Sequence, residues 1–260
     1  SMEEESYKFT YLPKTLPTLC SKDFKQYFEK WYLKDRLRAW CFSFDKSFQH
    51  YRKEKFVHDF FHDEVVLANI QAMSPSGAWG YVGMQTYNVA IEELNSTVTS
   101  LNFFDKLKNE GIVRENGSIC KCFDEFYEGV TISDELRKML LLEDSDNFEC
   151  YSDEERKEFI FKLFFHFVIG GPICQFEDNI QPYLDVTKSL YKDLIAVQRD
   201  GETKEMIVLT KAYKVKTMDS KGCMTYPAEE EHDQTFAYLT IDPLKRQAVL
   251  LYHAWGKSLW

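Results

Sequence analysis

The chain has 260 residues, which suits one large domain or two small ones, and 44% of its residues are hydrophobic. Because a fold of this size buries roughly 75% of the surface that its unfolded chain exposes, it needs neither a disulfide nor a metal ion to be stable. The formal net charge is −10. A negative field repels phosphate backbones and anionic lipids, so the composition argues against binding to nucleic acid or to a membrane surface.

Most of the negative charge lies in one stretch of the sequence. Residues 124–158 contain 13 acidic and 4 basic side chains, and the rest of the chain is close to neutral. Such a stretch attracts basic partners, although a solvated face that keeps the protein soluble is the commoner explanation. Both interpretations stay open, and the candidate partner-binding residues in this stretch are Glu143, Asp144, Asp146, Asp153 and Glu154.

The seven cysteines are odd in number and include no C-x-x-C spacing. This usage predicts reduced, mostly buried thiols in a cytosolic protein. Residues 1–6 are expected to be a tag scar and a flexible N-terminus, because they lack the basic and apolar regions of a signal peptide. The most apolar stretch, residues 159–169, is too short to span a bilayer.

The first third of the chain is predicted to contain two helices and a strand. Ser21 is the expected N-cap of the first helix, and Phe56 and Phe60 lie at helical spacing in the second. Between them, residues 37–44 have the composition of a strand that ends at a turn. Residues 64–95 are ambiguous, with short strands expected around Tyr81 and Tyr87 and a loop at residues 74–77.

The middle third is predicted to be mainly helical. A helix from Leu101 should end near Gly111, where a glycine suits a left-handed cap, and Asn116-Gly117 predicts a hairpin between residues 112–114 and 119–121. Ser133 is expected to begin a helix that ends near residue 142. These assignments follow from local turn and cap chemistry alone.

Two further helices are predicted before the pattern changes. Ser152 to Glu155 form a capping box, and the helix that they begin is apolar nearly all round, which is typical of a central core helix. It should end at Gly170-Gly171-Pro172, and Pro182 suits the first turn of the next helix.

From residue 195 onward the apolar period changes from 3.6 to 2. Asp200-Gly201 is expected to join one strand to a second strand over residues 205–215. A last hairpin is expected to join residues 236–241 to residues 248–255. The sequence therefore predicts a single α+β domain over residues 7–260. Its helices lie mainly in the first two thirds and pack on a mostly antiparallel sheet with C-terminal hairpins.

The strongest candidate for metal chemistry is the pair His58 and His62. Four residues apart on a helix, the two imidazoles would share one face, as zinc ligands do in H-E-x-x-H enzymes, with Asp59 in place of the glutamate. A third ligand cannot be identified, and an outer helix face is the simpler explanation. The alternative function that stays open is an unrecognised or degenerate metal-dependent enzyme.

The other candidates for chemistry are weaker. Adjacent His232 and Asp233 would point to opposite faces of a strand, which argues against a shared iron site with His253. Cys120 and Cys122 would share a strand face, but no second ligand pair follows them. Phosphate-binding and nucleophile motifs are absent from the sequence. We therefore expect no catalytic residue, no cofactor and no metal site.

Four collinear stretches of the sequence match one family. They are F-S-F-D-K-S-F-Q-H-Y-R-K at 42–53; I-S-D-E-L-R at 132–137 with L-E-D-S at 142–145; C-Q at 174–175 with E-D at 177–178, P-Y-L at 182–184 and Y-K-D-L at 191–194; and Q-T-F at 234–236 with D-P at 242–243 and L-Y-H at 251–253. Through these blocks the chain resembles the cilia- and flagella-associated protein 300 family over nearly its whole length.

The resemblance implies a non-catalytic factor that assembles or delivers the outer and inner dynein arms of motile cilia as a protein-binding adaptor. It implies action in the cytoplasm and in the motile cilium or flagellum, at the axoneme. The implied partners are dynein assembly co-chaperone-like factors, axonemal dynein chains, or both. The resemblance carries over no catalytic residue.

Overall fold

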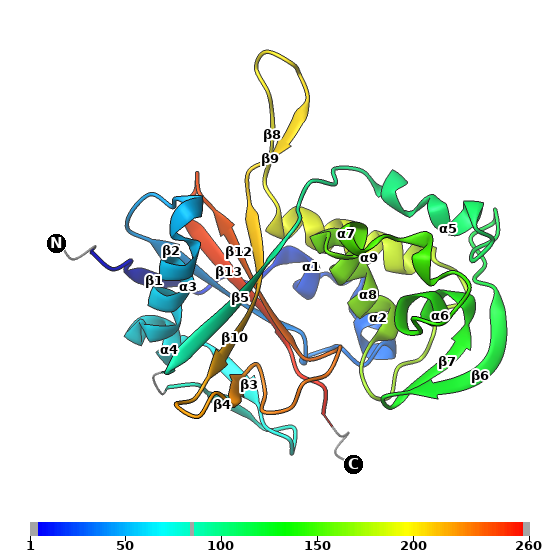
Figure 1. The fold of residues 1–260 in the computed structure, drawn as a ribbon, viewed down its shortest axis with the longest axis horizontal. Coiled ribbons are helices and arrows are strands. Elements are labelled where there is room, and N and C mark those ends of the chain that lie inside the picture. Colours follow the sequence, from blue (N-terminus) through cyan, green and yellow to red (C-terminus); the bar gives the residue numbers. More distant parts are fainter. Residues whose placement is uncertain (1–4, 84–85, 257–260) are drawn as a thin grey trace. The chain divides into compact units, whose positions relative to one another are not determined.

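The computed structural model describes residues 5–83 and 86–256 (Figure 1). The predicted α+β class is confirmed, because the helices end by Leu194 and every ladder between the described strands is antiparallel. Residues 1–4 of the expected flexible N-terminus lie outside the described residues.

The chain divides into two compact units. Unit 1 comprises Ser1–Leu16, Asp35–Leu94 and Leu194–Trp260, and unit 2 comprises Pro17–Lys34 and Asn95–Asp193. The prediction of a single domain over residues 7–260 rests on the sequence, which has neither an internal repeat nor a low-complexity linker. The division does not decide whether the chain is one domain, so the single domain stays a prediction.

Unit 1 is built on a seven-stranded sheet in the order β1-β2-β13-β12-β10-β11, with β5 also paired to β10. One edge of β10 pairs with β5, along residues 212–218 of β10. The other edge of β10 is shared by two strands: β12 pairs with residues 211–214 and β11 with residues 217–218. The C-terminal hairpin β12–β13 therefore lies in the middle of the sheet. The strands are β1 (Phe9–Leu12), β2 (Arg38–Phe44), β5 (Asn88–Leu94), β10 (Lys211–Met218), β11 (Met224–Tyr226), β12 (Phe236–Asp242) and β13 (Gln247–His253).

An aromatic layer joins the helices of unit 1 to one face of this sheet. The helices are η1 (His50–Arg52), α3 (Lys53–His62) and α4 (Glu64–Asn69). The ring centroid of Phe56 lies 4.8 Å from that of Tyr7 and 5.0 Å from that of Phe44, and Phe60 lies 5.4 Å from Phe42. These contacts are T-shaped, and each contributes about 0.5–1.5 kcal/mol beyond the burial of area. The predicted helix around Phe56 and Phe60 is thus confirmed, together with the strand before it.

The ambiguous residues 64–95 fold as α4, β3 (Gln71–Met73), β4 (Trp79–Tyr81) and β5. β3 and β4 form a separate two-stranded sheet. β4 and β5 correspond to the short strands expected around Tyr81 and Tyr87.

The turn predicted at Asp200-Gly201 is confirmed between two paired strands, but the prediction of one continuous strand over residues 205–215 is wrong. β8 (Val197–Arg199) and β9 (Met206–Val208) form a two-stranded hairpin of their own, and β10 begins only at Lys211. The hydroxyl of Thr210 accepts a hydrogen bond from the Ala196 backbone nitrogen at 2.8 Å. This contact with Ala196, just before β8, holds the chain at the break between β9 and β10. The alternation of apolar residues along the sequence does not reveal it.

Unit 2 is organised around α8 (Phe159–Ile169), in which nine of the eleven residues are buried, as expected of a central core helix. Gly170 ends it with a φ of 66°, and a Cβ there would lie 2.7 Å from the Trp31 carbonyl oxygen. The other elements are α1 (Pro17–Cys20), α2 (Lys25–Lys30), η2 (Leu101–Phe104), α5 (Lys106–Asn109), β6 (Lys121–Tyr127), β7 (Val130–Asp134), α6 (Glu135–Leu141), η3 (Phe148–Cys150), α7 (Asp153–Arg156) and α9 (Gln181–Leu194).

Two predicted N-caps are wrong. α2 begins at Lys25 with Phe24 as its N-cap residue, whereas the Ser21 hydroxyl accepts from the nearby Asp23 nitrogen. Ser133 belongs to β7, and Asp134 caps α6 instead. Aspartate caps a helix as well as serine does, so the choice between the two neighbours depends on partners distant in sequence.

The predicted capping box of Ser152 and Glu155 is confirmed, but the helix that it begins stops at Arg156. The chain breaks at Glu158, whose carboxylate accepts from the backbone and hydroxyl of Thr97. The Asn95 carbonyl accepts from the Phe159 nitrogen at 2.7 Å. A segment sixty residues earlier in the chain therefore divides the helix in two.

The hairpin predicted at Asn116-Gly117 is reduced to a turn with one bridge, between Val113 and Ile119. The longer hairpin is β6–β7, which the sequence patterns did not predict. Its turn residues, Glu128 and Gly129, both have positive φ, at 47° and 81°. A polar residue followed by glycine between two β-prone segments was the available signal.

All seven cysteines are free, as the sequence predicted. The prediction that most of them are buried is wrong. Of the seven thiols, one is buried, at Cys41, four are partly exposed, and those of Cys20 and Cys223 are exposed.

A buried ion pair links four elements of unit 2. The guanidinium of Arg137 in α6 contacts the carboxylate of Asp134, and both side chains are fully buried. The same guanidinium donates to the Val168 carbonyl at 2.9 Å and to the Tyr183 hydroxyl at 3.0 Å. It also lies 3.4 Å over the ring of Phe176. Burying a charge is costly unless it is paired in this way.

Replacing Arg137 with methionine should lower the free energy of unfolding by about 3–5 kcal/mol, because the buried Asp134 would lose the partner of its ion pair. In the double variant Asp134→Asn/Arg137→Met the charge is removed and the cap is kept, so the loss should be smaller. Urea unfolding of both variants checks this. A double variant that loses as much stability as the single one would contradict it.

His253 in β13 gives a second prediction. Burial lowers the pKa of this fully buried imidazole from 6.5 to about 4. The unfolded chain therefore binds a proton between these pH values that the folded chain does not, so stability falls as the pH falls from 6.5 towards 4. The loss should reach about 3 kcal/mol.

In the wild type the His253 imidazole contacts the Gln234 carbonyl. In the variant His253→Asn, the amide nitrogen can still donate to this carbonyl, but the asparagine side chain carries no titratable group. Hydrogen exchange of β12 and β13 between pH 4 and 7 measures the difference. An identical pH dependence in variant and wild type would show that His253 is not its source.

Candidate functional site

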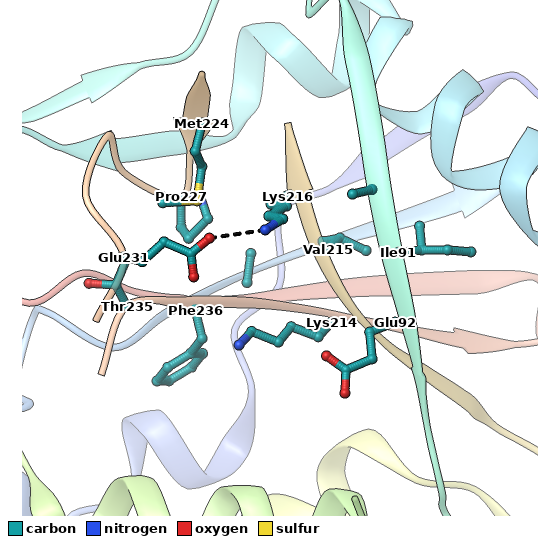
Figure 2. Close-up of a pocket in the computed structure, with 12 residues that line it drawn as sticks. Ile91, Glu92, Lys214, Val215, Lys216, Met224, Pro227, Glu231, Thr235 and Phe236 are labelled. Atoms are coloured by element: carbon teal, nitrogen blue, oxygen red, sulfur yellow. Dashed lines mark hydrogen bonds and ion pairs between the residues drawn. The ribbon is translucent and has the colours of Figure 1, made fainter. Parts of the chain in front are cut away.

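A hollow lies where the sheet of unit 1 opens between β12 and β11 (Figure 2). Its lining includes apolar Val215 and Phe236, and it includes Lys216, which is ion-paired to Glu231 at 3.0 Å. Its volume is about 240 Å³, which is below the roughly 300–1,000 Å³ that is typical of ligand pockets. The hollow therefore carries no argument for a substrate.

The histidine pair predicted as a metal candidate lies on the outer face of α3. The His58 and His62 rings stack with centroids 3.9 Å apart, and His62 Nδ1 lies 2.6 Å from the His58 carbonyl oxygen. The Asp59 carboxylate is turned inward, where it accepts from the Tyr7 nitrogen at 2.9 Å and from Lys55. Among the residues that the structure describes, no group of three His, Cys, Asp or Glu side chains could hold a metal ion.

The second histidine set is likewise engaged with other groups. His253 is buried in β13 against the Gln234 carbonyl, and His232 stacks on Trp255 with ring centroids 4.3 Å apart. The Gln234 nitrogen donates to His232 Nδ1 at 3.0 Å. These contacts fix the loop before β12 and leave no shared cation position between the two imidazoles.

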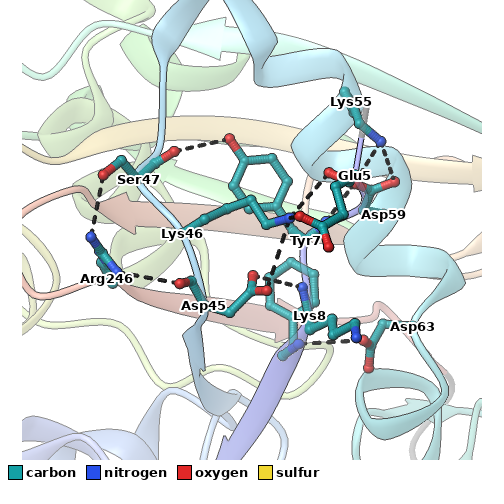
Figure 3. Close-up of polar contacts among 11 residues, drawn as sticks. Glu5, Tyr7, Lys8, Asp45, Lys46, Ser47, Lys55, Asp59, Asp63 and Arg246 are labelled. Carbon is teal, nitrogen blue, oxygen red and sulfur yellow. Dashed lines mark hydrogen bonds and ion pairs between the residues drawn. The ribbon is translucent and has the colours of Figure 1, made fainter. Parts of the chain in front are cut away.

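The polar residues of the first family-like block hold the N-terminal strand in place (Figure 3). Asp45, at the end of β2, accepts from the Lys8 nitrogen at 3.0 Å, and the Arg246 guanidinium donates to the Asp45 carbonyl. The Tyr7 hydroxyl donates to the Ser47 carbonyl at 3.2 Å. This block therefore specifies how β1 joins the sheet.

The other blocks also contribute contacts of the framework. I-S-D-E-L-R supplies the buried pair of Asp134 and Arg137. In the third block, Glu177 accepts from Lys30 at 2.7 Å. In the last block, the Tyr252 hydroxyl donates to the Pro227 carbonyl at 2.7 Å and accepts from the Met73 nitrogen. Surfaces suited to binding must therefore be sought among exposed residues outside these contacts.

The five acidic residues proposed for partner binding are all exposed. They lie in the loop between α6 and η3 and in the first turn of α7. Glu154 is held by Lys157 at 3.3 Å and by the Asn95 amide, and these hydrogen bonds lower the pKa of its carboxyl. We refer to Glu143, Asp144, Asp146, Asp153 and Glu154 as the acidic surface.

One guanidinium, missed in the sequence, fixes the shape of this surface. Arg156 donates to the Met139 carbonyl at 2.9 Å and to the Phe148 carbonyl at 2.7 Å, and it stacks 3.7 Å over the Phe148 ring. Burial lowers the pKa of Arg156, and the charges of Asp153 and Glu143 act in the opposite direction. The Arg156 guanidinium therefore holds the loop between α6 and η3 from its inner side, and the carboxylates of the acidic surface lie on its outer side.

The carbonyl groups that Arg156 binds are backbone atoms, which no pattern of side chains identifies. A hint was available, because Arg156 is one of only four basic residues within 35 residues of mostly acidic sequence. Basic residues among so many acidic ones are expected to be paired.

In the described ranges, the structure contains no helix with the length and apolar character needed to cross a bilayer. Comparison with solved structures gives no match.

Comparison with known sequences gives a consistent result. The profile of the family described as "Cilia- and flagella-associated protein 300" matches residues 6–253. A protein of that name from Chlamydomonas reinhardtii is 34% identical over 252 residues, which cover 94% of this chain and 97% of the relative. Another, from Paramecium tetraurelia, is 31% identical over 253 residues, or 97% and 95% of the two chains. The chain belongs to the cilia- and flagella-associated protein 300 family.

Proposed function

We propose that this protein is a non-catalytic factor for the assembly or transport of outer and inner dynein arms in motile cilia, and that it acts as a protein-binding adaptor. Membership of a cilia- and flagella-associated family over nearly the full chain is the observation that supports a ciliary role. That the protein serves dynein arms, and that it acts in the cytoplasm and at the axoneme, goes beyond this observation and is part of the proposal.

The adaptor role is supported by the distribution of chemistry over the described residues. The histidines with ligand spacing are stacked or buried, and the hollow in unit 1 is small. The acidic surface, in contrast, is exposed and held in one shape by Arg156. Exposed charges on a fixed frame favour recognition of a complementary surface more than they favour bond chemistry.

The partners that we propose are dynein assembly co-chaperone-like factors, axonemal dynein chains, or both. A basic surface on the partner would complement the acidic surface, and such contacts mainly raise the rate of association and its dependence on salt. Membranes and nucleic acids are not proposed, because both are anionic.

Reversing the charge of the acidic surface tests this site. The variant Glu143→Lys/Asp144→Lys/Asp146→Lys should capture dynein chains or assembly factors roughly tenfold less well, with a weaker dependence on salt. Affinity purification from ciliated cells measures the captured amounts.

A matched control reverses the same number of charges in unit 1, at Glu202, Glu205 and Glu229, which are exposed as well. Equal capture by both triple variants would exclude the acidic surface and leave the adaptor role open. Normal dynein arms in motile cilia of cells that lack the protein would contradict the proposed function itself.

The second variant keeps the charge of the acidic surface and changes the contacts that hold its loop in shape. Arg156→Lys retains one cation but loses the planar fork that binds two carbonyl groups at once. Hydrogen exchange over residues 143–150 should become faster, and partner capture should fall although the net charge is unchanged. Arg199→Lys, at an exposed position of β8, is the matched control. Faster exchange with full capture would show that the shape of the loop is not used in binding.

A further inference from the structure

The hairpin β6–β7 of unit 2 has an open edge. β6 pairs with β7 and with no other described strand, so the two form a sheet of their own. In an antiparallel pair, half of the backbone N–H and C=O groups of each strand point away from the partner strand. The side of β6 that faces away from β7 carries no other described strand, and such an edge is the usual template for strand addition.

Two phenylalanines stand out on this strand. Phe123 is 96% exposed and Phe126 is 79% exposed, which are the highest values among the large hydrophobic side chains of the described chain. A single exposed apolar residue is ordinary, but two such phenylalanines on one strand are not. Phe123 lies where the β6–β7 register shifts, between Lys121 and Glu125, so the pairing does not place its ring on a particular face.

The register of the hairpin excludes a role for Phe126 in the core. Phe126 is opposite Thr131, whereas the neighbouring Glu125 is opposite Ile132, which is fully buried. Residues directly opposite each other share a face of the sheet, so Phe126 lies on the face away from Ile132. The core side of this strand carries a glutamate, and the outer side carries the aromatic ring.

Charge indicates what the edge would accept. Asp124 and Glu125 lie between the two phenylalanines in the acidic stretch of the sequence, and Lys138 lies 3.8 Å from the Glu125 carboxylate. A second copy of this chain would bring like charges together along the edge, and like charges directly opposite each other destabilise strand pairing. A strand with basic side chains would be attracted, and its apolar residues could cover the exposed rings.

We propose that β6 is a docking strand, which binds an extended segment of a partner protein in which basic and apolar residues alternate. Backbone hydrogen bonds to the β6 edge would supply affinity, and the contacts with Phe123, Phe126 and the flanking carboxylates would supply selectivity. This surface is separate from the acidic surface, and it requires neither dynein arms nor the proposed function.

The test uses the purified full chain and a fluorescein-labelled decapeptide of alternating valine and lysine, with binding measured by fluorescence anisotropy. The double variant Phe123→Ser/Phe126→Ser should bind roughly tenfold more weakly. An alternating valine–glutamate peptide should bind the wild type roughly tenfold more weakly than the valine–lysine peptide does, because its negative charge is repelled by the edge. A valine–lysine peptide that is N-methylated on alternate residues keeps its side chains but loses backbone donors, and it should bind roughly tenfold more weakly too.

Tyr81→Ser is the matched control, because Tyr81 is an exposed aromatic residue, 67% exposed, on the small sheet β3–β4 of unit 1. This variant should bind the peptide as the wild type does. Circular dichroism establishes that the variants are folded, which their exposed positions favour.

Equal binding by the phenylalanine variant, or equal binding of the N-methylated peptide, would overturn the proposal. Light scattering over a range of concentrations addresses the other possible occupant of the edge. A dimer that the phenylalanine variant abolishes would show that the edge serves a second copy of the chain instead.

Discussion

The two surfaces proposed for binding both depend on one buried charge, the guanidinium of Arg137. It joins the end of β7 to α6 through Asp134, and it reaches the carbonyl of Val168 at the end of α8 and the hydroxyl of Tyr183 in α9. The β6 hairpin precedes this junction, and the acidic loop follows it. A buried cation with several fixed acceptors tolerates few arrangements, so it specifies one packing of these elements as well as stabilising them.

The residues by which the chain resembles its family and the residues proposed to bind partners are largely different sets. Asp45, Arg137 and Tyr252 are engaged with backbone or buried groups, so they specify the fold. Phe123 and Asp153 are exposed, where a substitution leaves the packing unchanged. Recognisable motifs in an adaptor can therefore identify the family without locating the surface that it uses.

Features governed by local periodicity could be predicted from the sequence, including the core helix α8 and the hairpin β12–β13. Features set by distant partners could not. Glu158 interrupts a helix because of Thr97, and Thr210 ends a strand because of Ala196. The acidic surface was visible as charge, whereas Arg156 beneath it binds carbonyl groups that no side-chain pattern shows. The open edge at β6 escaped notice because its phenylalanines lack a regular period.

The central position of β12–β13 has a consequence for the protein while it is being made. Ribosomes synthesise β2 and β10 before the hairpin that separates them in the finished sheet. Until residues 236–253 have left the exit tunnel, the nascent chain therefore carries two hydrophobic strands with unpaired inner edges. Such edges are sites of misassembly in crowded solution. The newly made chain is therefore most prone to wrong strand pairing before β12 and β13 are complete.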